Sequence, residues 1–213
     1  MRRVLAVGCG GLTRESADLL AANPGTQFAG CVDDDPATHG RVVAGQPVHG
    51  GLERLPPLLA ADPELQVVLC IANARRPTVR LDVAARLGLE TTRYAVLVHP
   101  TASVARATTI GPGSILLAHV VTTADAAIGA HCVLMPAVIL THDDVLGDGV
   151  TVAAGVRLAG SVRVGAGAYL GSGALIREGV SVGAGAVIGM GSVVLEDIPD
   201  GQVWVGNPAR LLR

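Results

Sequence analysis

The chain has 213 residues, a length that accommodates one or two domains, and its formal net charge is -2. Because it carries no cluster of lysines and arginines, a nucleic-acid-binding surface is excluded. Only 2% of the residues are aromatic whereas 28 are glycine, which indicates a narrow core of small aliphatic side chains.

The first predicted elements are a strand over residues 3–7, a glycine-rich turn at residues 8–11 and a helix through residue 20. A second strand over residues 28–32 ends in the aspartates at 33–35. The N–H groups and dipole of a helix N-terminus suit a phosphate, and acidic residues after the second strand suit a ribose or base edge. The alternative is that the glycines merely let the helix pack closely on its strand.

Residues 66–71 form a third predicted strand, and residues 75–87 form a helix that Gly88 ends. A further strand at residues 95–98 leads into the rest of the chain. We therefore expect a first α/β domain over residues 1–95. A unit of this length holds only half of a dinucleotide-binding fold, which favours a mononucleotide over NAD.

From residue 98 to residue 194 an aliphatic residue returns at every sixth position, and only Thr122 breaks the rule. Four positions after each lies a small or β-branched residue, except at Asp144. A period of six fits neither a helix nor an alternating strand, so it indicates a structural repeat. Three hexads close one triangular coil of about 18 residues, and stacked coils pair as parallel strands. We expect this β-helix over residues 96–199.

Residues 107–124 carry no charged side chain, as in a membrane span. Gly111 and Pro112 interrupt this segment and the hexads continue through it, so we expect a coil of the β-helix and no membrane insertion. The N-terminus lacks the apolar run of a signal peptide. Four cysteines without metal-ligand or redox spacing are expected to be reduced packing residues of a cytoplasmic protein: Cys9, Cys31, Cys70 and Cys132.

Several hexads begin with an aliphatic residue followed by glycine, such as Ile110-Gly111 and Ile188-Gly189. In this the sequence resembles the hexapeptide-repeat acyltransferases, and the resemblance implies a left-handed parallel β-helix. An α/β unit followed by a hexad repeat resembles in particular the bacterial sialic acid O-acetyltransferases and UDP-4-amino-sugar N-acetyltransferases. In those enzymes the N-terminal Rossmann-like half-unit holds the nucleotide of a UDP-sugar. The resemblance covers essentially the whole chain.

Residues 141–148, with the sequence THDDVLGD, match the most specific motif of these enzymes. The resemblance implies that His142 is the general base that takes a proton from the acceptor as it attacks the thioester. It also implies that Asp143 raises the basicity of this histidine. An imidazole that titrates near neutral pH suits the role, and by register His142 lies on the coil surface near a corner.

Two residues depart from the family pattern. Asp144 occupies an inward position where the family usually has cysteine, and a buried carboxylate there needs partners. It is expected either to contact His142 or to distort the corner. Thr151 stands nine positions after His142, where these enzymes often carry a second histidine that contacts the acetyl donor. That contact is either made by the hydroxyl or lost.

The resemblance also implies the residues that bind the two substrates. Gly160 lies 18 positions after His142 and matches a glycine whose N–H faces the thioester carbonyl. Ser172 and Met190 match positions that meet coenzyme A mainly through main-chain atoms. The looser match in the N-terminal unit assigns four residues to the nucleotide-sugar: Gly10, Gly11, Asp33 and Asp34.

Residues 200–213 resemble the family's closing segment near the pantetheine, and they are also expected to cap the open end of the β-helix. The resemblance implies an acetyl-CoA-dependent acetyltransferase, a homotrimer with its site between adjacent β-helices. The expected acceptor is an amino group on a nucleotide-linked sugar, and the alternative is a hydroxyl of a sugar or natural product. A non-catalytic β-helix scaffold is the hypothesis of another class. The lack of a histidine triad in family spacing argues against a metal.

Overall fold

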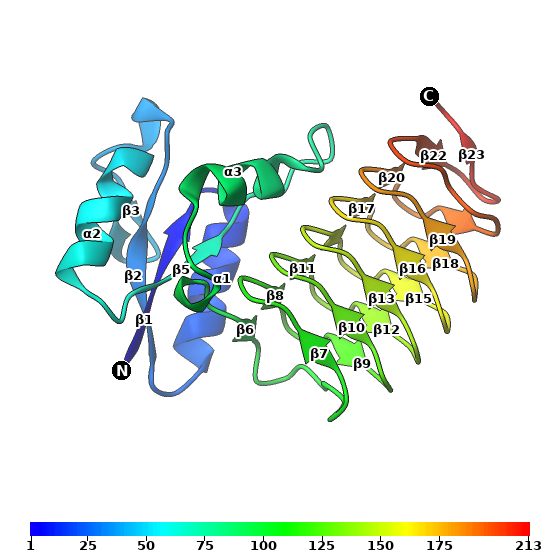
Figure 1. Ribbon diagram of the computed structural model, residues 1–213, viewed down its shortest axis with the longest axis horizontal. Coiled ribbons are helices and arrows are strands. Elements are labelled where there is room, and N and C mark those ends of the chain that lie inside the picture. The colour runs from blue at the N-terminus through cyan, green and yellow to red at the C-terminus, as the bar shows by residue number, and fades with distance from the viewer.

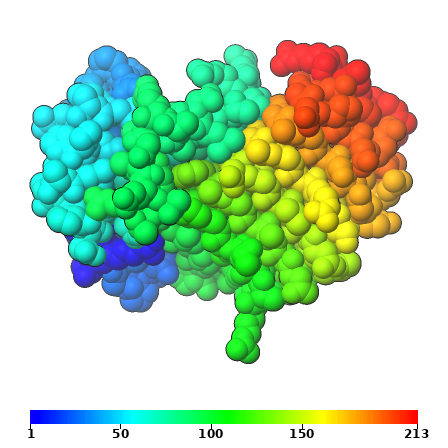
Figure 2. All heavy atoms as spheres, viewed as in Figure 1, coloured from blue at the N-terminus to red at the C-terminus, as the bar shows by residue number.

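The computed structural model describes residues 1–213 and has two parts (Figure 1). An α/β unit lies at one end, and a long β-helix extends from it towards the C-terminus. Figure 2 shows the α/β unit, in blue and cyan, packed against the green and yellow-green coils that begin the β-helix.

The α/β unit is built on a three-stranded parallel sheet in the order β2-β1-β5. Its strands are β1 (Arg2–Val7), β2 (Thr26–Val32) and β5 (Gln66–Leu69). Each strand ends in an unbroken buried run, as expected for parallel strands covered on both faces. Helix α1 (Gly11–Ala22) buries its apolar stripe against this sheet. The connections contain η1 (Pro36–Thr38), β3 (Val42–Val43), β4 (Gln46–Pro47), η2 (Leu52–Arg54), α2 (Leu55–Ala61), α3 (Val79–Leu87) and η3 (Thr91–Arg93).

The helix expected over residues 75–87 begins only at Val79. Pro77 is the reason, because a proline disfavours helical backbone at the residue before it. The structure also adds α2, which the sequence analysis did not predict. This helix starts Leu55-Pro56-Pro57, where the prolines sit in the first turn and cost no hydrogen bond.

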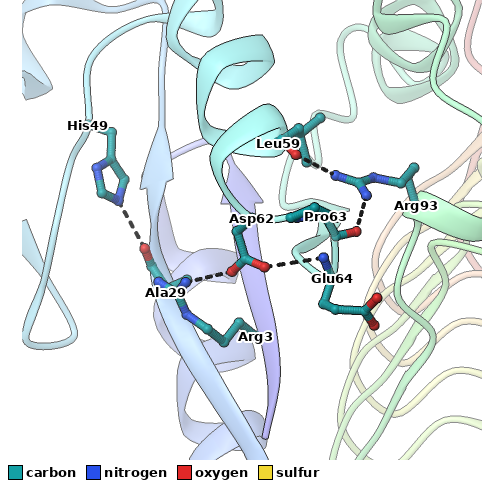
Figure 3. A network of polar contacts seen from close by, with 8 residues as sticks. All are labelled: Arg3, Ala29, His49, Leu59, Asp62, Pro63, Glu64 and Arg93. Carbon is teal, nitrogen blue, oxygen red and sulfur yellow. Dashed lines mark hydrogen bonds and ion pairs between the residues drawn. The ribbon is translucent and has the colours of Figure 1, made fainter.

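A set of polar contacts beside the sheet holds α2 in place (Figure 3). Arg3 forms an ion pair with Asp62, the C-cap residue that follows α2, at 2.6 Å. Arg93 of η3 donates to the carbonyl oxygens of Leu59 and Pro63. These contacts join β1, α2 and η3 within the α/β unit.

The β-helix consists of three sheets of parallel two-residue strands, except that the second sheet ends in the three-residue β22 and the antiparallel β23. The first sheet holds β7 (Thr109–Ile110), β10 (Ala127–Ile128), β13 (Val145–Leu146), β16 (Arg163–Val164) and β19 (Ser181–Val182). The second holds β6 (Leu97–Val98), β8 (Ile115–Leu116), β11 (Val133–Leu134), β14 (Thr151–Val152), β17 (Tyr169–Leu170), β20 (Val187–Ile188), β22 (Val203–Val205) and β23 (Arg210–Leu211). The third holds β9 (Val121–Thr122), β12 (Ile139–Leu140), β15 (Arg157–Leu158), β18 (Leu175–Ile176) and β21 (Val193–Val194). From β6 to β21, neighbouring strands within each sheet are 18 residues apart, as Ile128 and Leu146 are, so the predicted coil length is confirmed for these coils.

The sixth-position aliphatic residues form the core of the β-helix, and 25 buried side chains make one continuous cluster. Thr122 points inward with them and is buried. Its hydroxyl contacts Thr108 Oγ1 at 2.8 Å and accepts a hydrogen bond from the Ala105 N–H at 2.9 Å. The one polar residue in the aliphatic pattern is therefore buried with its hydroxyl hydrogen-bonded, near the first coil.

The C-terminal residues extend the second sheet. Strand β22 pairs in parallel with β20, and β23 folds back antiparallel on β22. Trp204 packs against the core cluster beside the last full coil. None of the helices combines the length and the apolar composition that a membrane crossing requires.

Candidate active site

His142 lies at the corner where the chain passes from the third sheet to the first, between β12 and β13. We call the stacked turns at residues 141–144 and 159–162 the histidine corner. The side chains of His142 and Asp143 are 64% and 62% exposed, so the surface position expected from the hexad register is confirmed.

His142 Nδ1 lies 2.8 Å from Asp143 Oδ2. Because a carboxylate only accepts hydrogen bonds, this contact places the imidazole proton on Nδ1 and leaves the Nε2 lone pair free. Asp143 adopts a left-handed backbone with φ 63°, a conformation that aspartate tolerates better than most residues. The turn thereby directs the carboxylate towards the ring.

Gly160 lies directly beneath the imidazole, one coil further on. A Cβ atom at Gly160 would come within 2.3 Å of His142 Cε1 and Nε2, so only glycine leaves room for the ring. The turns are tied together because Ser161 N–H donates to the His142 carbonyl oxygen at 2.8 Å. The structure therefore brings together His142, Asp143 and Gly160.

Asp144 points into the coil and is fully buried. Its Oδ2 accepts from the Thr141 N–H at 2.7 Å and its Oδ1 from the Val162 N–H at 2.9 Å. Burial raises the pKa of Asp144, and these two N–H groups oppose the rise. The carboxylate thus joins two successive turns of the histidine corner and forms no hydrogen bond with His142.

Ser172 and Met190 stack on each other at a different corner, where the second sheet passes into the third. The Gly191 N–H donates to the Ser172 carbonyl oxygen at 2.9 Å, and the Met190 side chain is largely exposed. The width of the third sheet separates them from the histidine corner within one chain. The predicted donor-binding residues therefore lie on two corners of the triangle.

A cavity of about 400 Å³ opens at the carboxyl ends of the strands in the α/β unit. It is lined by Gly8, Asp33 and Asp34, and by the opposite wall that α3 and its preceding loop supply. Ligands of parallel α/β sheets bind at this edge. Gly10 and Gly11 begin α1 just beyond the cavity, with open space where their side chains would lie.

Both predicted aspartates already have partners within the chain. Asp33 Oδ2 accepts from the Cys9 N–H at 2.8 Å and so fastens the glycine-rich turn to β2. Asp34 accepts from the Leu52 N–H at 2.9 Å and from Arg86 at 2.8 Å. The Leu52 N–H and then the Arg86 guanidinium lower the pKa of Asp34.

The sequence analysis missed two arginines that line the same cavity, Arg76 and Arg86. They come from the loop before α3 and from α3 itself, which lie 40 or more residues after Asp34 in the chain. Their only sequence signal is their positive charge after the third strand. Arg76 lies 3.8 Å from Asp82 and Arg86 lies 2.8 Å from Asp34, and both guanidinium groups remain more than half exposed at the cavity.

Thr151 does not reach the surface. It is buried at the start of β14, where its hydroxyl accepts a hydrogen bond from Arg80 of α3 at 2.8 Å. The expectation that the Thr151 hydroxyl contacts the acetyl donor is therefore wrong. No group of three or more histidine, cysteine or acidic side chains is arranged to hold a metal ion.

Comparisons with known proteins agree with this fold. Residues 161–196 match the family model described as bacterial transferase hexapeptide (six repeats). No curated protein matches the sequence significantly. Among solved structures, GDP-perosamine N-acetyltransferase from Caulobacter crescentus, crystallised with CoA and GDP-perosamine as a histidine-to-alanine variant, is 30% identical. The match covers 99% of this chain and 96% of that one with a TM-score of 0.89.

A second solved relative is the acetyltransferase domain of PglB from Neisseria gonorrhoeae in complex with acetyl coenzyme A. It is 33% identical, covers 99% of both chains and has a TM-score of 0.83. These matches extend over both the α/β unit and the β-helix. With the hexads, the His142 motif and the full-length likeness together, the chain belongs to the hexapeptide-repeat acyltransferases.

Proposed function

We propose that this protein transfers the acetyl group of acetyl-CoA to an amino group of a nucleotide-linked sugar, with His142 as the general base. The carrying observation is the histidine corner, where an exposed imidazole is held by Asp143 over Gly160. The relative from Caulobacter crescentus is named for N-acetyl transfer to GDP-perosamine and was crystallised with CoA and that sugar nucleotide.

In the proposed reaction the amine nitrogen attacks the thioester carbonyl carbon while His142 Nε2 takes the amine proton. Asp143 keeps the proton on Nδ1 and stabilises the imidazolium that forms. The carbonyl oxygen becomes an oxyanion, and as it re-forms the carbonyl the carbon–sulfur bond breaks. The thiolate that leaves takes the proton from the His142 imidazolium and departs as coenzyme A. The Gly160 N–H donates no hydrogen bond within the chain, so it is free to stabilise that oxyanion.

The nucleotide of the acceptor is assigned to the cavity at the carboxyl ends of β1, β2 and β5. One wall of the cavity carries Asp33 and Asp34, and the α3 wall carries Arg76 and Arg86 together with Asp82. Arg76 and Arg86 suit the diphosphate, whereas Asp33 and Asp34 suit a base or ribose edge. The first-turn N–H groups of α1 at Gly11 offer a second phosphate contact.

The assembly we propose is a homotrimer with each site between neighbouring β-helices. One argument is that Gly160 and Ser172 lie on different corners of one chain. If the histidine corner of one chain packs beside the Ser172 corner of a second chain, residues of both kinds meet in one site. The other is the outward face of the third sheet, where half-buried or exposed aliphatic side chains lie on either side of Arg157: Val121, Ile139, Leu175 and Val193. We expect the purified protein to have three times the chain mass by light scattering. An active monomer would contradict the shared site.

The function is tested by incubating the protein with acetyl-CoA and a panel of GDP-, UDP- and dTDP-linked amino sugars, with products identified by mass spectrometry. His142→Ala should lower kcat by roughly 100-fold or more, because general-base catalysis contributes at least that factor. The KM for acetyl-CoA should stay near the wild-type value.

His119→Asn is the matched control, because His119 is an exposed corner histidine with φ 60° that lies away from Asp143. It should keep wild-type turnover. Wild-type turnover in His142→Ala would contradict the general base. A wild-type protein that acetylates no member of the panel would contradict the acceptor class.

A further inference from the structure

Arg80 is the most deeply buried charged side chain in the α/β unit, with a relative exposure of 1%. It leaves the first turn of α3 and reaches into the β-helix. Its Nε donates to the His131 carbonyl oxygen at 2.7 Å, and its Nη2 donates to the Gly149 carbonyl oxygen at 2.9 Å and to Thr151 Oγ1 at 2.8 Å. A further bond goes to the Ile71 carbonyl oxygen of its own unit.

All of these partners are neutral. Burial lowers the pKa of Arg80 to about 10, so the guanidinium keeps its charge near neutral pH without a carboxylate partner. Burying a cation is costly even when its hydrogen bonds are satisfied, and an apolar side chain would give stability more cheaply. The guanidinium instead makes directional hydrogen bonds, and its planar set of N–H donors holds α3 against two successive coils at once.

The coils make room for α3. A Cβ atom at Gly149 would lie 2.6 Å from Leu81 Cγ, and one at Gly167 would lie 2.8 Å from Thr78 Cγ2. Both glycines lie on the corner between the first and second sheets. The start of α3 therefore sits against this corner with no space for a side chain beneath it, and Arg80 locks it there.

The opposite side of α3 lines the nucleotide cavity through Val79, Asp82, Val83 and Arg86. The coil that receives Arg80 at Gly149–Thr151 is also the coil that carries His142 on its preceding corner. The strands of this coil are hydrogen-bonded to the coils before and after it, so the coil holds His142 and the residues that bind Arg80 in a fixed arrangement. One short helix thus joins the wall of the acceptor pocket to the coil that supplies the base.

We propose that Arg80 is a positioning residue that sets the distance and orientation between the nucleotide-sugar pocket and the histidine corners. The inference rests on the proposed function. An acceptor held at its nucleotide can present its amine to an imidazole only if pocket and β-helix keep one relative placement. In a trimer, the packing between neighbouring β-helices must hold this placement as well.

The test compares Arg80→Met and Arg80→Lys with the wild-type protein. We expect Arg80→Met to lower kcat/KM for the nucleotide-linked sugar by at least about 10-fold, since small misplacements of reacting groups cost this much or more. Calorimetric Kd values for GDP or UDP alone and for CoA alone should change by less than about 2-fold. Arg80→Lys should have a kcat/KM between those of Arg80→Met and the wild-type protein, because an ammonium group reaches fewer of the acceptors.

Arg93→Met is the matched control. Arg93 also donates to carbonyl oxygens, those of Leu59 and Pro63, but both belong to the α/β unit (Figure 3). It should keep kcat/KM within about 2-fold once melting curves show that the protein is folded. Thr151→Val removes a single acceptor of Arg80 and is the milder variant should Arg80→Met fail to fold.

Wild-type kcat/KM in a folded Arg80→Met would overturn the proposal. Equal losses of nucleotide affinity, CoA affinity and turnover would also overturn it, because they would show general destabilisation. Hydrogen exchange provides a readout that does not depend on substrate identity, and α3 should exchange faster in Arg80→Met while residues 141–144 do not. A wild-type protein that acetylates no nucleotide-linked sugar refutes the proposed function instead, and unchanged exchange at α3 would then still refute the coupling.

Discussion

The imidazole of His142 is held from two sides, by the Asp143 carboxylate at Nδ1 and by the bare backbone of Gly160 beneath the ring. Only the second support can be removed without touching a titratable group. We predict that Gly160→Ala lowers kcat by at least about 10-fold, because the new Cβ displaces the ring and misplacement by about 1 Å costs up to about 100-fold. Steady-state kinetics with the nucleotide-linked sugar measures this.

The control for this substitution is the His142→Ala background. The three atoms nearest to a Cβ at Gly160 all belong to the imidazole, and Gly160 is not in the left-handed region. With the ring gone, Gly160→Ala should change the residual rate by less than about 2-fold. A loss of equal size in both backgrounds would mean that the glycine acts through its own backbone and not through the ring.

At the scale of elements, the turn between β1 and α1 contains glycines of two kinds. Gly8 has φ 102°, and a Cβ there would lie 2.9 Å from the Cys70 carbonyl oxygen. Gly11 has ordinary backbone angles, and the nearest atom to its added Cβ is Arg14 Nη2 at 3.9 Å. The first glycine is required by the packing of β1 against β5, and the second is not.

We therefore predict that Gly11→Val folds normally but raises the acceptor KM by roughly 10-fold, or about 1.4 kcal/mol, because the β-branched side chain keeps the phosphate away from the N–H groups of the turn. Gly8→Ala should instead destabilise the fold by about 1–3 kcal/mol, the cost of a non-glycine residue in strained backbone. Thermal melts and acceptor kinetics on both variants separate the two effects. An unchanged acceptor KM in a folded Gly11→Val would remove the N-terminus of α1 from the binding site.

The elements that could be predicted from the sequence are those whose signal is local and repeated. The hexads placed the strands of the β-helix and put His142 outside and Asp144 inside before any coordinates were known. The contacts that could not be predicted join residues far apart in the chain. Asp144 finds the Val162 N–H one coil on, and Arg80 reaches a coil some 70 residues later, so neither partner leaves a sequence signal.

In the whole molecule, the junction between the α/β unit and the β-helix buries a second titratable group beside Arg80. The ring of His131 meets the ring of Tyr94 edge-on, with centroids 4.5 Å apart, and its Nδ1 has no hydrogen-bond partner. Burial, and then the positive charge of Arg80, lower the pKa of His131, while Asp148 opposes them. The junction is thus built around a neutral imidazole.

A folded-state pKa below the ordinary 6.5 means that the unfolded chain binds a proton at His131 before the folded chain does. Stability from this group is therefore complete above about pH 6.5 and is lost as the pH falls below that value. The pKa of Asp34 is lowered, so the stability that this group contributes is lost only as the pH falls below about 3.8. The pKa of Asp144 is raised, so its contribution to the free energy of unfolding changes with pH in the opposite direction. The decline just below pH 6.5 can thus be assigned to His131 by comparing variants.

We predict that the urea midpoint of the wild-type protein falls between pH 7 and pH 5.5, and that His131→Asn has a flatter profile. Asparagine suits this position because the backbone is left-handed with φ 55°. The smaller side chain lowers stability at every pH, so the slope and not the midpoint carries the result. Equal slopes in the two proteins would show that His131 takes up its proton without disturbing the junction, and that α3 and the coil beneath it tolerate a second positive charge beside Arg80.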